Sequence, residues 1–313
     1  MANTVNMIKR INSRGSEEIL LQQQHISIDD LKQTDEIKQE DIYKKYISKK
    51  YIPDYPTPVE FHITEVAHAT NKTGLPQILN SEGFKGLDED SFSWWSLKIN
   101  EADIRAAEER FLESLFPERT EEESAAQQPF LSKFTTSPAF NNENSHYSNF
   151  CFTFLLTELM EAYKKQMCEG EEPVLRVYGT KLFNKLIEYV VLVHSPQNNE
   201  KFSQYPLLTS SPLISYDGNQ IIWRAQAICR NHKYQQVING NQAFFQKLEI
   251  KDSEYYVWDQ VSLAFQVKEV LTFPKERLKP SACEIFTKPK LNRSNEEKLS
   301  REEAEEYLKT FQW

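Results

Sequence analysis

The order in which helical and strand-like segments follow one another is the feature that most limits how this chain can fold. Two amphipathic helices are predicted early, over 103–116 and 154–167, each with apolar residues on one face. The sequence after them consists of short runs rich in β-branched and aromatic residues, separated by turn-forming residues. The predicted strands cover 174–178, 187–193, 220–229, 243–250, 254–261 and 267–273. Helices early and strands late, without regular alternation, predict an α+β domain with mainly antiparallel sheets and argue against a doubly wound sheet or a TIM barrel.

Shorter signals indicate how these segments are connected. Asp217-Gly218 and Asn239-Gly240 are typical of β-hairpin turns. A short helix is expected before Gly83, because the apolar residues of 74–83 have helical spacing and glycine commonly ends a helix. The polar residues 118–130 are predicted to form a loop.

Composition restricts the kinds of partner that the chain can have. The 313 residues are 39% hydrophobic and 12% aromatic, which is enough for a hydrophobic core. The net charge of -9 and a pI near 5.4 argue against nucleic acid as a main partner, because non-specific binding to phosphates requires a basic surface. No run approaches the roughly 18 apolar residues of a membrane span, and the N-terminus lacks the apolar centre of a secretory signal. We therefore expect a cytoplasmic protein that does not associate with membranes, with the nucleus as an alternative location.

The four cysteines, Cys151, Cys168, Cys229 and Cys283, lie far apart in the sequence, with no Cys-x-x-Cys and no histidine at the spacing of zinc ligands. Isolated cysteines of this kind are usually packed in a core. We expect no bound metal.

The two ends of the chain differ in composition from its middle. Residues 1–52 are rich in Gln, Lys, Glu and Asp, and no segment has an apolar face wide enough for a core, so this region is predicted to be a mostly flexible polar arm. Pro53, Pro56 and Pro58 would then lead the chain in extended conformation into a strand. The folded domain is expected over 53–280. The charged tail, 281–313, is expected to contain an isolated helix over 294–308.

The common catalytic and nucleotide-binding motifs are absent from the sequence. It has no Gly-x-Ser-x-Gly, no phosphate-binding Gly-x-x-x-x-Gly-Lys, no Gly-x-Gly-x-x-Gly and no His-Glu-x-x-His, and it contains only 8 glycines. A dinucleotide would therefore have to be held by side chains and strand backbone.

Two short motifs carry candidate functional side chains. In Phe61-His62-Ile63-Thr64, alternation along a strand directs His62 and Thr64 to the same side. In Ser253-Glu254-Tyr255-Tyr256-Val257-Trp258-Asp259, a carboxylate opens an aromatic strand. Each candidate also has a purely structural interpretation. His62 is then a strand histidine bonded to backbone, Glu254 a carboxylate at a solvated strand end, and Tyr163 a core residue of the helix over 154–167.

Together and in this order, the two motifs resemble the NAD-binding shell of poly- and mono-ADP-ribosyltransferases of the diphtheria-toxin-like class. In that class a His-Gly-Ser/Thr motif is followed by a helix that ends near a Gly-Phe pair, and His62-Ile63-Thr64 is followed by Gly83-Phe84. The class has two aromatic residues eleven positions apart, as Phe152 and Tyr163 are. It also has a late strand of sequence Glu-Tyr-x-Val-Tyr-Asp, to which the motif that begins at Glu254 is similar.

This resemblance implies a fold of ADP-ribosyltransferase-like split antiparallel β-sheets with flanking helices, with NAD as the substrate and no metal. It implies that His62 binds the adenosine ribose and that Glu254 bonds to the nicotinamide ribose. Both residues are then expected to be catalytic, with Glu254 as the main one. Ile63 and Thr64 would line the NAD site, and Phe152 and Tyr163 would stack around the nicotinamide.

Two positions depart from the pattern of the class. Ile63 stands where the class has a glycine whose backbone holds the carboxamide, and its bulk narrows the expected pocket. Met160 replaces a serine three residues before the stacking tyrosine, which removes one hydrogen bond worth about 1 kcal/mol. Neither change removes Glu254, so the resemblance implies retained activity.

A second resemblance covers about residues 59–273. The block Ser91-Phe92-Ser93-Trp94-Trp95-Ser96-Leu97, the segment 189–196 and Ile222-Trp223-Arg224-Ala225-Gln226-Ala227 resemble an interferon-inducible family of fish and other lower vertebrates. That family takes its name from the second gene found to be induced by grass carp reovirus. The resemblance implies an antiviral role in innate immunity.

Two functions from different classes are left open by the sequence. The first is an NAD-dependent mono-ADP-ribosyltransferase that modifies a protein acceptor. The second is a non-catalytic binder of NAD or ADP-ribose, or a scaffold, that engages a viral or host protein. Exposed side chains at Trp94 and Trp95 would favour the second function, because clustered surface aromatics mark interfaces, whereas buried ones would belong to the core.

Overall fold

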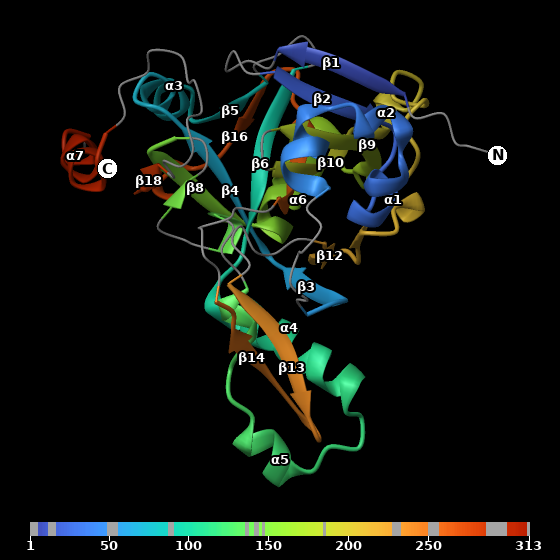
Figure 1. Ribbon diagram of the computed structural model, residues 1–313. Helices are drawn as coiled ribbons and strands as arrows, with labels where there is room; N and C mark the ends of the chain where they lie inside the picture. The colour runs from blue at the N-terminus through green and yellow to red at the C-terminus, as the bar shows by residue number, and fades with distance from the viewer. Residues whose placement is uncertain are drawn as a thin grey trace.

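The computed structural model describes residues 6–11, 17–48, 56–86, 91–134, 138–140, 144–145, 148–183, 186–226, 233–249, 257–285 and 299–311 (Figure 1). Within these residues the largest element is a nine-stranded sheet. Its strands, in spatial order, are β1 (Met7–Ile11), β2 (Glu17–Gln22), β9 (Val174–Phe183), β10 (Leu186–His194), β15 (Trp258–Gln266), β6 (Phe92–Lys98), β4 (Glu65–Thr70), β8 (Phe150–Leu155) and β17 (Ser281–Ala282). The expected α+β class with several antiparallel sheets is confirmed.

One pair in the centre of this sheet is parallel. β10 and β15 run side by side from Leu186 opposite Trp258 to Val193 opposite Phe265, while the other paired neighbours of the sheet are antiparallel. Every residue of these two strands is buried, because the sheet is covered on both faces here. Continuous apolar runs such as 189–193 are typical of strands buried on both faces.

Smaller sheets surround the large one. Their strands are β3 (Val59–Ile63), β12 (Ile221–Ala225) and β11 (Ile214–Tyr216) in a three-stranded sheet, and the pairs β13 (Tyr234–Asn239) with β14 (Gln242–Lys247), β5 (Gly83–Lys85) with β16 (Val270–Thr272), and β7 (Asn144–Ser145) with β18 (Glu284–Ile285). The hairpin turns predicted at Asp217-Gly218 and Asn239-Gly240 are confirmed, since they connect β11 to β12 and β13 to β14.

The helices flank the sheets. They are α1 (Ile28–Gln33), α2 (Asp35–Lys38), α3 (Gly74–Ser81), α4 (Glu101–Leu115), α5 (Glu121–Ala126), α6 (Leu156–Met167) and α7 (Arg301–Leu308), with a π-helical turn at Tyr43–Ile47 and 3-10 turns at Leu131–Lys133, Pro138–Phe140, Pro196–Asn198, Leu208–Ser210 and Lys275–Arg277. The long helices α4 and α6 and the short helix α3 match the predicted ones within a few residues. The helix predicted over 294–308 is confirmed for 301–308, which form α7, with Ser300 as the N-cap; residues 294–298 lie outside the described residues. In Figure 1, α4, α5 and the β13–β14 hairpin project together from the rest of the molecule.

The prediction of a loop over 118–130 is wrong, because α5 lies within it. The sequence signal was a capping box, in which the Thr120 hydroxyl accepts from the Glu123 backbone N–H and the Glu123 carboxylate accepts from the Thr120 backbone N–H. α5 has no buried residue and therefore no apolar stripe by which to recognise it.

The prediction of a flexible N-terminal arm without a core face is wrong for the described residues of 1–52. β2 pairs with β9 in the large sheet, and Leu20 and Leu21 are fully buried. Leu31 of α1 and Ile37 of α2 are also fully buried, in the same core as the rest of the molecule. The predicted domain boundary near residue 53 therefore divides a region whose described parts share one core.

Two apolar clusters hold the fold together. The larger one includes residues of the large sheet, α3, α4 and α6, and the smaller one lies on the opposite face of β10 and β15. Trp95, which is 1% exposed, lies in the larger cluster against Phe84 and Phe154. Trp94, on the other face, is half-buried and carries the Lys181 ammonium 3.9 Å from its ring centroid. The double tryptophan is therefore part of the packing and not an exposed docking surface.

No helix among the described residues is long and apolar enough to cross a lipid bilayer.

Candidate functional site

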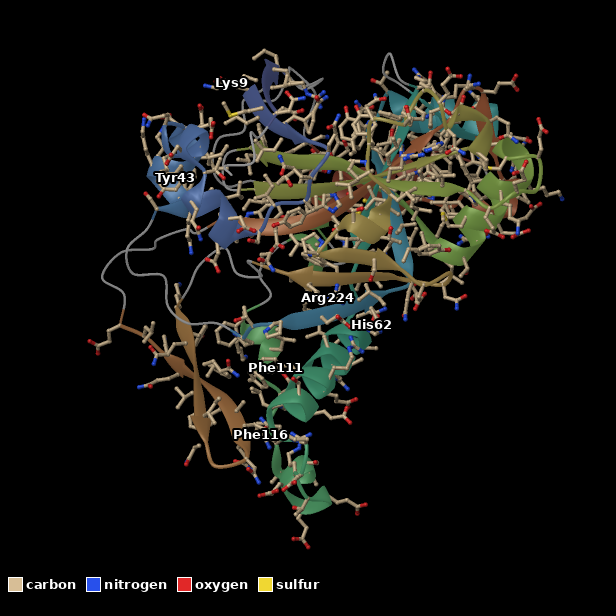
Figure 2. All side chains as sticks on the ribbon, turned by 90° about the vertical axis from the view of Figure 1, so that its right-hand side faces the viewer. Lys9, Tyr43, His62, Phe111, Phe116 and Arg224 are labelled. Carbon is tan, nitrogen blue, oxygen red and sulfur yellow. The ribbon has the colours of Figure 1, made fainter. Side chains whose placement is uncertain are left out.

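His62 lies in a small group of polar side chains on the outer face of the three-stranded sheet, here named the His62 cluster, made of Glu60, His62, Gln220 and Arg224. The Nε2 of His62 is 2.9 Å from Oε1 of Glu60, and the other Glu60 oxygen is 3.0 Å from a guanidinium nitrogen of Arg224. The Nδ1 of His62 faces the Gln220 side-chain amide at 3.4 Å. Figure 2 shows His62 and Arg224 close together beside α4.

The strand sequences explain why these side chains share one face. In β3 and β12, apolar and polar residues alternate, so Phe61 and Trp223 point into the core and their polar neighbours point outward. The register pairs Arg224 with Glu60 across the two strands, which places opposite charges side by side. Arg110, from α4, donates to the Glu60 backbone carbonyl at 2.8 Å and fixes the helix against the edge of β3.

The His62 cluster is accessible to solvent, and its carboxylate is charged. Burial acts to raise the pKa of Glu60, but the hydrogen bond from His62 and the charge of Arg224 outweigh it and lower this pKa, so Glu60 is ionised at neutral pH. The His62 side chain is 27% exposed. With Nε2 bonded to the Glu60 carboxylate, Nδ1 of the partly exposed imidazole faces the Gln220 amide as a hydrogen-bond acceptor.

The two residues after His62 have different surroundings from those expected. Ile63 is fully buried in the main core, and Thr64 is exposed just beyond the end of β3. The Thr64 carbonyl accepts a hydrogen bond of 2.7 Å from the backbone N–H of Leu156, the first residue of α6. This bond connects the predicted motif to the start of the helix that carries Tyr163.

The two candidate stacking residues are completely buried. Phe152, on β8, packs edge to face against Phe84, and Tyr163, on α6, packs against Phe265 and donates to the Gln266 backbone carbonyl at 2.7 Å. Burial raises the pKa of Tyr163 well above its usual value, so this hydroxyl stays protonated. Stacking on nicotinamide stays a prediction for both rings, and it requires their present neighbours to move.

Glu254 lies outside the described residues, but the end of its motif does not. Asp259, on β15, is fully buried, and its carboxylate accepts a hydrogen bond of 2.8 Å from the backbone N–H of Gln226, just after β12. β12 in turn pairs with β3. The two motifs, far apart in the sequence, are therefore connected through one intermediate strand.

A second histidine, which was not predicted from the sequence as a site residue, has the same His-x-Thr pattern. His68-Ala69-Thr70 lies on β4, and His68 is directly opposite Phe152 in the β4–β8 register. The His68 ring is 4.9 Å from the Phe84 ring. This motif comes directly before α3 and Gly83-Phe84, closer than His62 does, and that spacing was the signal available in the sequence.

The protonation state of His68 follows from its surroundings. Its Nδ1 is 2.9 Å from the Trp94 backbone carbonyl, to which it donates. Burial lowers the pKa of His68 to about 4, so the ring is neutral at physiological pH. With Nδ1 protonated, Nε2 of the same ring is an acceptor.

Among the described residues, no three histidine, cysteine, aspartate or glutamate side chains are grouped as metal ligands. Comparison of the chain with models of protein families, with curated proteins and with solved structures found no match.

Proposed function

We propose that this chain binds NAD in an ADP-ribosyltransferase-like site and transfers ADP-ribose to a protein acceptor. The observation that best supports this function is the convergence of His68, Phe84 and Phe152. A His-x-Thr strand, the following helix and its Gly-Phe end, and the first candidate aromatic residue meet around one ring. Gly83-Phe84 and Phe152 are sequence features on which the resemblance to the ADP-ribosyltransferases depends, and His68-Ala69-Thr70 supplies the His-x-Thr pattern that the resemblance placed at His62-Ile63-Thr64.

In this proposal His68 takes the role first given to His62. A neutral histidine with Nδ1 bonded to the Trp94 carbonyl has its other ring nitrogen ready to accept a hydrogen bond from a ribose hydroxyl. His62, which bonds to Glu60 and faces Gln220, is better suited to an outer position, where the His62 cluster would contact the acceptor protein.

The proposed chemistry requires one carboxylate, that of Glu254. When the bond between C1′ of the nicotinamide ribose and the nicotinamide nitrogen breaks, positive charge develops on the ribose. A carboxylate that accepts a hydrogen bond from the ribose hydroxyl stabilises this charge. A nucleophilic oxygen or sulfur of the acceptor then bonds to C1′ and loses its proton to water, while nicotinamide leaves as a neutral molecule. The antiviral role in innate immunity rests on the resemblance to the interferon-inducible family.

A second function, non-catalytic binding of NAD or ADP-ribose or a scaffold role, is favoured by one specific observation. Phe152 and Tyr163 have no exposed ring surface, whereas stacking on nicotinamide requires an open face. A protein that keeps this core closed would engage viral or host partners through its surface instead.

A labelled-NAD assay separates the two functions. The purified chain is incubated with NAD labelled on the adenine and with cell proteins, beside Glu254→Gln and the control Glu269→Gln, which changes an exposed carboxylate. We expect label on protein, reduced about 100-fold or more in Glu254→Gln and unchanged in the control. Full transfer by Glu254→Gln would contradict the catalytic assignment.

The choice between the two histidines is tested in the same assay. His68→Gln should weaken NAD binding, measured as the rise in melting temperature on adding NAD, while His62→Gln should leave this rise unchanged. The opposite result would restore the role to His62. A rise in melting temperature without any transferred label would support the binder, and the absence of both would refute an NAD site.

A further inference from the structure

Two cysteines far apart in the sequence meet at the edge of the large sheet. β17 pairs with β8 such that Ser281 is opposite Cys151, and the Cys283 backbone N–H donates to the Asn149 carbonyl at 2.7 Å. Alternate residues of a strand point to the same face, so Cys151 and Cys283 occupy diagonal positions on one face.

Each thiol influences the protonation of the other. The neighbouring Cys283 thiol, together with burial, raises the pKa of Cys151, whereas the neighbouring Cys151 thiol lowers the pKa of Cys283 against the effect of burial. The Cys283 Sγ is also 4.0 Å from the Ser281 backbone carbonyl oxygen, to which its S–H donates. The positive charges of Lys98 and Arg301 add to the lowering at Cys283. Cys283 is therefore the thiol of the pair that is more readily deprotonated and more reactive.

We propose that Cys151 and Cys283 are a reversible redox modification site, at which oxidation by a low-molecular-weight disulfide such as glutathione disulfide forms a bond between β8 and the residue that directly follows β17. This inference does not depend on the proposed ADP-ribose transfer.

The reaction is an ordinary thiol–disulfide exchange. The Cys283 thiolate attacks one sulfur of glutathione disulfide, and one glutathione thiolate leaves. The Cys151 thiolate then attacks the Cys283 sulfur of the mixed disulfide, and the second glutathione leaves. Two protein thiols lose two electrons and two protons, and one glutathione disulfide becomes two glutathione molecules.

The fold allows this exchange at modest cost. Diagonal residues of an antiparallel pair are about 7–8 Å apart, so a disulfide requires a backbone movement of about 1 Å. β17 is a two-residue strand at the edge of the sheet and can move or open more easily than a central strand. Such opening also gives glutathione access to the two buried sulfurs.

The bond would fasten the C-terminal part of the chain to the sheet. Asn149, next to this pair, already donates through its side-chain amide to the backbone carbonyls of Cys283 and Leu299 and accepts from the Leu299 backbone N–H. Leu299 lies two residues before Arg301, the first residue of α7. Oxidation would therefore add a covalent link to a place where hydrogen bonds already hold the end of the chain.

The test uses the full chain with Cys229→Ser, since Cys229 lies outside the described residues. The protein is incubated with glutathione disulfide about 10 °C below its melting temperature, so that edge strands open, then alkylated, digested and analysed by mass spectrometry. We expect a linked peptide pair containing Cys151 and Cys283, and a melting temperature higher by about 5 °C that returns to its original value with dithiothreitol.

Two variants make the result specific. Cys283→Ala should abolish both the linked peptide and the rise in melting temperature. Cys168→Ala should change neither, because Cys168 lies at the end of α6, where burial raises the pKa of its thiol to about 11. Free thiols at both Cys151 and Cys283 after this treatment, or a link that involves Cys168, would overturn the proposal.

Discussion

Glu108, on α4, illustrates how a single charged residue can stabilise a fold from inside it. Its carboxylate is buried and accepts hydrogen bonds from the backbone N–H groups of Phe130 and Leu131, at 2.8 and 2.6 Å. Replacing Glu108 with alanine leaves both N–H groups buried without a partner. We expect Glu108→Ala to lower the free energy of unfolding by about 3 kcal/mol, measured by urea denaturation. Glu109→Ala, at the exposed neighbouring position, should change it by less than about 0.5 kcal/mol, and an equal loss in both variants would contradict this interpretation.

The buried histidines determine how stability responds to acid. Burial lowers the pKa of both His25 and His68 to about 4, against about 6.5 for the unfolded chain. Between these values the unfolded chain binds more protons, so stability is fully present above pH 6.5 and is lost as the pH falls to 4. The expected loss is about 3 kcal/mol for each histidine.

The variant His25→Gln tests this contribution. Glutamine can still bond to Ser211 and to the Val190 carbonyl, which His25 contacts at 2.8 and 3.0 Å. Urea denaturation at several pH values should show a smaller loss of stability between pH 6.5 and 4 in the variant. Identical pH profiles would show that His25 does not bind a proton on unfolding.

At the scale of the element, two capping boxes of the same kind should have different effects. Asn100 caps α4, which buries Phe111 and Leu112, whereas Thr120 caps α5, which buries no residue. Asn100→Ala should lower the global free energy of unfolding by about 1 kcal/mol. Thr120→Ala should mainly speed amide hydrogen exchange within α5, because that helix can open by itself. A similar global loss in both variants would mean that α5 unfolds only together with the core.

Hydrophobic periodicity predicted the elements that are long enough to show it. α4, α6 and β10 were found in this way, because their apolar residues repeat over several turns or fill a whole strand. β6 and β4, which also lie in the centre of the large sheet, were not predicted as strands. The contribution of the N-terminal elements to the core was not predicted, because α1 and α2 are six and four residues long and the buried residues Ile19, Leu20 and Leu21 are consecutive. Neither pattern has a period, so only packing against the rest of the molecule reveals that these residues form core.

The candidate site was predictable only in part, for a reason that belongs to the whole molecule. The motifs could be found in the sequence, and the spacing to Gly83 could have selected His68. The pairing of Glu60 with Arg224 could not, because it depends on the register between β3 and β12, which are distant in the chain. Whether Phe152 and Tyr163 are open or buried likewise depends on what the final fold places over them.

The N-terminal segment should be required for folding. A chain that begins at residue 53 loses β2, the neighbour of β9, together with the fully buried Leu20, Leu21, Leu31 and Ile37. We expect this shortened chain to lack a cooperative thermal transition by circular dichroism and to aggregate on size-exclusion chromatography. Removing 299–313 should cost much less, since α7 fully buries only Ala304. A cooperative transition in the chain that begins at residue 53 would contradict this prediction.

The parallel pairing of β10 with β15 has a consequence for how quickly the protein reaches its fold. The two strands are separated by the connection 195–257, which contains β11, β12, β13 and β14, so the centre of the large sheet joins two distant stretches of chain. Closing so long a loop costs conformational entropy before the contacts between the two strands compensate for it. Chains rich in contacts between residues far apart in the sequence therefore fold slowly. Refolding should therefore be limited by the docking of β15 beside β10, and changes of length within 195–257 should alter this rate far less than substitutions in the two strands themselves.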